Sequence, residues 1–166
     1  MSKLITTAYY DRRAVQNVNG LFTIKTTLDD AIVEEFSKLP ARSGQNGFLD
    51  SWTTAKSPIP FSNELISDLY IWLDGQKQIG QWPTGGQIGE FWNISTDDDR
   101  VTIRGKNGKI RKVIGAHPEN AYAGSAGCVV LLHETEEQKQ RILAVRDYLK
   151  QLHEVRKIEK IRLIVL

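Results

Sequence analysis

Alternating hydrophobic and polar positions predict β-strands at both ends of the chain. Residues 4–10 and 21–26 are rich in β-branched and aromatic side chains. The dipeptide Asn19-Gly20 between them is favoured in tight hairpin turns. Residues 161–165 place apolar side chains at every second position, which predicts a last strand added to the same sheet.

Helical spacing of apolar residues appears in two places. Thr27 is a candidate N-cap for a helix over residues 28–39, because Asp29 and Asp30 fall in its positive first turn and apolar residues follow until Pro40.

The second helix begins after Thr135, which forms a capping box with Gln138. Glu136 and Glu137 follow the cap, at the positive end of the helix dipole. The residues expected to form its buried stripe are Ile142, Val145, Leu149 and Leu152.

The middle of the chain alternates turn-rich segments with short apolar runs. Residues 41–60 contain glycines and prolines and predict a long surface loop, whereas residues 62–73 fit either a helix stripe or a strand. Apolar runs bounded by turn signals predict strands over 88–94, 101–104, 110–114 and 128–132, the middle two joined by a hairpin at 106–109. We therefore expect a β-rich α+β fold with two or three helices, in one domain over residues 1–166.

Composition narrows the possible partners. The 22 Lys+Arg against 20 Asp+Glu leave a net charge of +2, too small an excess to indicate binding to nucleic acid. A membrane-spanning helix needs about 20 consecutive apolar residues, and no segment of the sequence comes near this length. No signal peptide is recognisable. We expect synthesis in the cytoplasm, no membrane insertion, and no metal or other cofactor, since the chain has one cysteine and no metal-ligand spacing.

The single cysteine, Cys128, lies at the start of an apolar run, after a loop that begins near His117. If the loop folds back, the imidazole lies beside the thiol, the pairing that nucleophilic cysteine chemistry needs. The backbone N–H groups around Gly127 and Cys128 are natural donors to an oxyanion. The alternative is that Cys128 acts only as a small buried hydrophobe and His117 as a strand-end residue bonded to local backbone.

The segment Ser125-Ala126-Gly127-Cys128-Val129-Val130-Leu131 resembles the catalytic signature of the L,D-transpeptidase family, cysteine enzymes of bacterial cell-wall peptidoglycan. It is most similar to a divergent branch found in phage and secreted bacterial proteins, in which an upstream histidine remains. Residues 85–94 resemble the family segment that leads a strand toward the active site, and the resemblance is strongest over residues 80–166. Two departures are Ala126, where typical members have the catalytic histidine, and Val130, where they have an arginine.

The resemblance implies that Cys128 attacks an amide carbonyl of a peptidoglycan stem peptide and forms a thioester. His117 then acts as general base and acid, assisted by Ser125 and Gly127. Candidate substrate-binding residues are Asn120, Tyr122, Trp82, Arg104 and Arg111. For several of these, a turn or an exposed hairpin position is the simpler explanation.

Three functions remain open at this point. An amine acceptor would make the protein a transpeptidase, and water would make it a carboxypeptidase, an endopeptidase or a phage lysin of the same fold. A non-catalytic peptidoglycan-binding or phage structural module is the third. Each acts on the cell wall only if the protein is released or delivered there.

Overall fold

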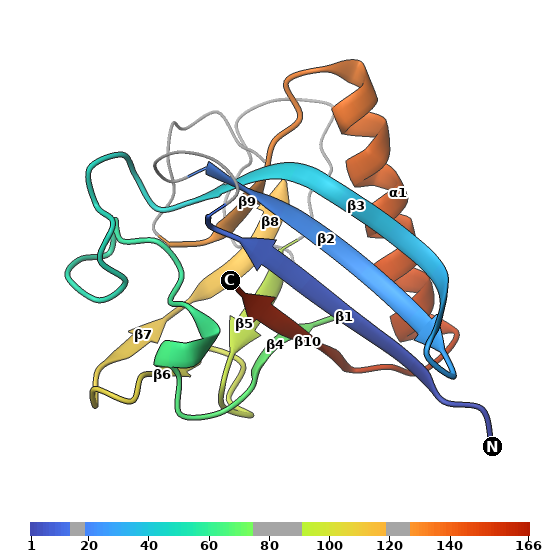
Figure 1. Cartoon of the computed structure of the whole chain (residues 1–166), viewed down its shortest axis with the longest axis horizontal. Helices are drawn as coiled ribbons and strands as arrows, with labels where there is room; N and C mark the ends of the chain where they lie inside the picture. Colours follow the sequence, from blue (N-terminus) through green and yellow to red (C-terminus); the bar gives the residue numbers. More distant parts are fainter. Residues whose placement is uncertain (14–18, 75–90, 119–126) are drawn as a thin grey trace.

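The structure is a computed structural model that describes residues 1–13, 19–74, 91–118 and 127–166. Within these ranges eight strands close into a barrel in the order β1-β10-β4-β5-β8-β9-β3-β2, and two more form a small separate sheet (Figure 1). The barrel strands are β1 (Leu4–Asp11), β2 (Asn19–Leu28), β3 (Ala31–Ser43), β4 (Leu69–Trp72), β5 (Trp92–Ser95), β8 (Ile114–Pro118), β9 (Val129–Leu131) and β10 (Lys160–Val165). The separate sheet pairs β6 (Thr102–Arg104) with β7 (Ile110–Lys112).

Strands β1, β2 and β10 bury every second side chain, as the alternation in the sequence predicts, whereas β5, β8 and β9 are buried at every position. In β1, for example, Ala8 and Tyr10 are fully buried while Tyr9 between them is only partly so. Neighbouring barrel strands are antiparallel except for two pairs, β1 with β10 and β8 with β9. The inward side chains of the barrel form one large core.

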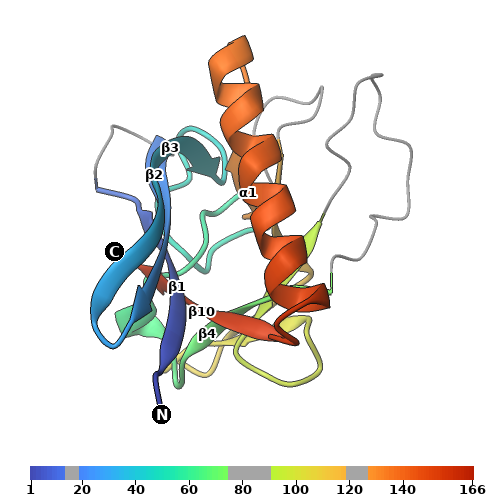
Figure 2. The same cartoon turned by 90° about the vertical axis from the view of Figure 1, so that its right-hand side faces the viewer.

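The helix α1 (Glu136–Glu154) lies against the barrel beside β3 (Figure 2). Its predicted start is confirmed, because the Thr135 side chain accepts a hydrogen bond from the Gln138 N–H at 3.1 Å and Gln138 returns the capping box. The four predicted stripe residues are buried and belong to the barrel core. On its barrel side Tyr148 also shares a hydrogen bond of 2.5 Å with Thr26 of β2.

The predicted helix over residues 28–39 is wrong, because this segment forms the end of β2 and most of β3. Asp29 and Asp30 have φ of 49° and 70° and make the turn of the β2–β3 hairpin. Aspartate tolerates this left-handed region, which the favoured two-residue hairpin turns require at both positions. The apolar residues at 28, 32 and 36 are four apart. Residues with this spacing lie on one face of a helix and equally on one face of a strand, where side chains alternate with a period of two.

Two further expectations need correction. The β1–β2 hairpin is confirmed, but Asn19 and Gly20 belong to β2 and pair with Arg42 and Ala41 of β3 rather than forming the turn. The described residues contain one α-helix rather than two or three, together with a short 3₁₀ helix, η1, over Ser62–Glu64.

Most of the remaining elements agree with the pattern of apolar runs, but the predicted strand 110–114 is divided at Val113, whose φ is 57°: β7 ends at Lys112 and β8 begins at Ile114 in the barrel. The ambiguous segment 62–73 resolves into η1 followed by β4, and the loop predicted from residue 41 begins after β3 ends at Ser43. The β6–β7 hairpin, β9 and β10 are confirmed, and β5 occupies the end of the predicted strand 88–94, whose first three residues lie outside the described residues. The β-rich α+β class is therefore confirmed. In the described ranges no helix is both long and apolar enough to span a membrane.

Candidate active site

His117, on β8, and Cys128, the residue immediately before β9, lie on one face of two neighbouring parallel strands. In the β8–β9 register Ala116 is opposite Val129, and both side chains point into the barrel core. Because side chains alternate along a strand, His117 and Cys128 must both point outward. Cys128 is level with Gly115, two residues before His117, so strand spacing and rise place the two Cα atoms about 8 Å apart.

This outward face is shielded from solvent although it lies outside the core. His117 is 5% exposed and Cys128 is 9% exposed. The Phe91 ring stacks on the His117 imidazole with centroids 5.6 Å apart and planes at 21°, and packs with Cys128 and Val130 in a cluster separate from the main core. Gly115 leaves room for that ring, because a Cβ there would overlap with it.

The tautomer of His117 follows from its neighbour. Its Nδ1 lies 2.8 Å from the carbonyl oxygen of Pro118, and since a carbonyl only accepts, Nδ1 carries the hydrogen. Nε2 is therefore the basic nitrogen of the neutral ring. Burial lowers the pKa of His117 and outweighs the bond to Pro118, which raises it, so the imidazole is neutral at physiological pH.

The Cys128 sulfur is a neutral thiol in the resting protein. Burial raises its pKa, and this effect exceeds the lowering by backbone hydrogen bonds from Gly115 and Cys128 itself and by the positive charge of Arg111. The site thus holds a neutral thiol and a neutral imidazole rather than a preformed ion pair.

The cation beside Cys128 is Arg111, a buried residue of β7. Its Nη1 donates to the carbonyl oxygens of Ser51, Ser57 and Pro58 at 3.1, 2.9 and 2.6 Å, and Nη2 donates to that of Ala55 at 3.3 Å. Burial lowers the pKa of Arg111, whereas its interaction with Cys128 raises it.

Gly127 connects this arginine to the cysteine. Its φ is +91°, a conformation natural to glycine, and a Cβ here would overlap with the Arg111 guanidinium. The Ser43 hydroxyl donates to the Gly127 carbonyl at 2.9 Å and accepts from the Ile59 N–H at 2.8 Å. The end of β3, the loop after it and the entry to β9 are thereby joined just before Cys128.

The structure separates the two hairpin arginines predicted to bind substrate. Arg104 lies on the opposite face of the β6–β7 sheet from Arg111, with its Nε 2.6 Å from a carboxylate oxygen of Asp97. Of the predicted residues, Gly127 and Arg111 lie beside Cys128, and His117 lies on the same outward face. Ser125, Asn120, Tyr122 and Trp82 lie outside the described residues.

Two residues that shape the site had no individual signal in the sequence. Phe91 lies in the segment 85–94, which the resemblance implies leads toward the active site without singling out this residue, and Ser43 lies in a segment predicted as loop. Their importance depends on which strands become neighbours, and only the fold supplies that information. In the part of the chain that the structure describes, no group of His, Cys, Asp and Glu side chains could hold a metal ion.

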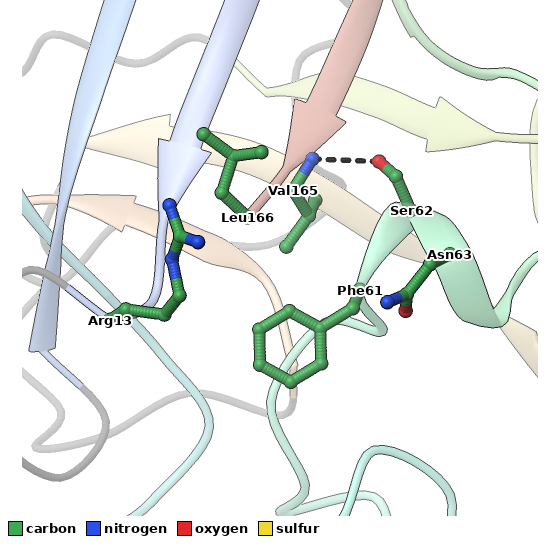
Figure 3. A pocket seen from close by; sticks show the side chains of 6 residues that line it. All are labelled: Arg13, Phe61, Ser62, Asn63, Val165 and Leu166. Atoms are coloured by element: carbon green, nitrogen blue, oxygen red, sulfur yellow. Dashed lines mark hydrogen bonds between the residues drawn. The ribbon is translucent and has the colours of Figure 1, made fainter.

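The described cavities lie elsewhere. One of about 410 Å³ opens at the end of β10, where the Val165 N–H donates to the Ser62 hydroxyl at 2.8 Å (Figure 3). It is lined by Arg13, Phe61, Ser62, Asn63, Val165 and Leu166. A smaller one, of about 190 Å³, lies between α1 and the ends of β4 and β5. Among the candidate catalytic residues that the structure describes, His117, Gly127 and Cys128 line neither cavity.

Comparisons of the chain with protein-family models, with curated proteins and with solved structures found no match. The geometry around Cys128 is therefore the basis on which a function can be argued.

Proposed function

We propose that the protein is a cysteine-dependent acyl-transfer enzyme that acts on peptidoglycan stem peptides through a thioester on Cys128, in an L,D-transpeptidase-like fold. The observation that carries the proposal is the common outward face of His117, on β8, and Cys128, the residue immediately before β9. Diagonal neighbours on adjacent strands are within reach of long side chains.

The protonation states support general-base catalysis. As the sulfur bonds to the amide carbonyl carbon, the S–H proton passes to Nε2 of His117, which Pro118 leaves unprotonated. The C–N bond to the leaving amine then breaks, and the imidazolium returns the proton to that amine. Cys128 is left as a thioester. Backbone N–H groups at Gly127 and Cys128 are the proposed donors to the oxyanion.

The second half-reaction decides between the two enzymatic alternatives. An amine acceptor loses a proton to His117, attacks the thioester and forms a new amide, and the proton returns to the sulfur as it leaves. Water in place of the amine gives a carboxylic acid and a shortened or cleaved stem peptide.

The low exposure of Cys128, 9%, specifically favours the non-catalytic alternative, a peptidoglycan-binding or phage structural module. A buried thiol with a raised pKa resists reagents unless a substrate or a movement of Phe91 opens the site. Enzyme and binding module therefore differ in whether the sulfur can be acylated at all.

The test combines acylation with product analysis. Intact-mass spectrometry after incubation with a carbapenem should show one covalent adduct, which Cys128→Ala abolishes together with turnover. Digested sacculi should contain new crosslinked dimers if the protein is a transpeptidase, and shortened stems if it is a hydrolase. An unmodified protein that still binds sacculi and leaves them unchanged would show that the binding module is correct.

A further inference from the structure

The Arg111 side chain is held in place by hydrogen bonds, unlike a mobile side chain that moves to bind a ligand. Its four described acceptors are backbone carbonyls of the single loop 51–58. Carbonyls orient the planar guanidinium through its rigid fork of donors. The guanidinium is thereby fixed in a shielded place, where electrostatic interactions are stronger than in water.

This charge is directed at the entry to β9. The guanidinium occupies the space in which a side chain of residue 127 would lie, so only glycine lets it approach the backbone that leads into Cys128. Ser43 holds the same point from the other side by bonding to the Gly127 carbonyl. The arginine, the loop and the cysteine thus form one connected unit.

We propose that Arg111 is a positioning residue for Cys128, which rests on the function proposed above: tied to the 51–58 loop and packed on Gly127, it holds the nucleophile in place and stabilises the negative charge that develops on sulfur when His117 removes the proton.

The electrostatics of the free protein agree with this role. Arg111 lowers the pKa of Cys128 against the larger opposite effect of burial, and the interaction raises the pKa of Arg111 in return. Other charged or titratable groups around the site are His117 from β8, Arg42 from β3 on the outward row of Val130, and Arg12, which lowers the pKa of Arg111. Among the described residues, Arg111 is the one whose charge changes the pKa of Cys128.

A positioning role and direct binding of a substrate carboxylate make different predictions. A positioning arginine changes the titration of Cys128 in the free protein and lowers kcat. An arginine that binds substrate leaves the free thiol unchanged and raises KM.

The experiment titrates the sulfur without any substrate. Because the chain has one cysteine, isotope-labelled cysteine gives one Cβ resonance that reports thiol against thiolate. In Arg111→Gln we expect the pKa of Cys128 to rise by about one unit, a tenfold smaller thiolate fraction at fixed pH, with a smaller rise in Arg111→Lys. The matched control is Lys112→Gln, the exposed neighbour on β7, which should leave the titration unchanged.

The Gln variant removes three buried hydrogen bonds and one partly buried one, so its amide spectrum must first show that it folds. If it does not, Gly127→Ala replaces it, since the added Cβ must displace the guanidinium and should raise the same pKa. An unchanged Cys128 titration in the folded variants would overturn the proposal, whether or not KM rises. A shifted titration in a protein that shows no acylation or turnover would instead uphold the link between Arg111 and Cys128 and refute the proposed enzyme.

Discussion

The two faces of β8 and β9 are built from the same two strands and serve different purposes. The inward face presents Ile114, Ala116, Val129 and Leu131, all aliphatic and all in the main core. The outward face presents an imidazole, a glycine and Val130, with the Cys128 thiol immediately before β9 and an arginine beside it, and it is nearly as well shielded. Burying polar and titratable groups costs stability, and the proposed chemistry assigns a use to their presence on the face that the barrel does not need for its core.

The largest expected effect tests the inward face. Leu131→Ala removes a fully buried side chain from the core and should lower the free energy of unfolding by about 2–5 kcal/mol, measured by urea denaturation. Cys128→Ala on the outward face should cost clearly less. Equal losses would show that the two faces are one core and would remove the distinction between them.

Gly115→Ala tests how tightly the outward face is packed. The new Cβ overlaps with the Phe91 ring, and overpacking of this kind costs about 1–3 kcal/mol. Adding Phe91→Leu should recover part of the loss, because a smaller side chain leaves room for the methyl group. Urea denaturation of both single variants and the double variant gives the coupling energy, and strictly additive changes would contradict the contact.

The sequence predicted most of the strands and α1, because these depend on local alternation, capping and helical spacing. It failed over residues 28–39, where helix and strand spacing coincide and the tertiary pairing with β2 decides the outcome. Of the site, His117 and Cys128 could be paired from their positions at neighbouring strand ends. The contacts of Arg111, Ser43 and Phe91 join segments distant in sequence, and no local pattern contains that information.

A smaller effect separates global stability from the site. Thr135→Ala removes the side-chain acceptor of the α1 N-cap and should lower the free energy of unfolding by about 1 kcal/mol in urea denaturation. The helix packs on the inward core, so the Cys128 Cβ resonance and its titration should stay as in the parent protein. A shifted titration would mean that the outward site responds to any loss of stability. The change in the pKa of Cys128 in the Arg111 variants could then not be assigned to the lost charge alone.

The smallest effect is a pH dependence carried by His117. Burial lowers its pKa in the folded protein below the ordinary 6.5, so the unfolded chain binds more protons as the pH falls through that value. Stability should therefore be constant above about pH 7, as far as this residue is concerned, and decrease on acidification until the folded-state pKa is reached.

Urea midpoints across this range should show the decrease in the parent and a weaker one in His117→Gln. Cys128→Ala should keep the parent slope, because the raised pKa of the thiol moves its titration to alkaline pH. A His117→Gln variant with the full slope would place the imidazole in water and remove the shielded base on which the outward face depends.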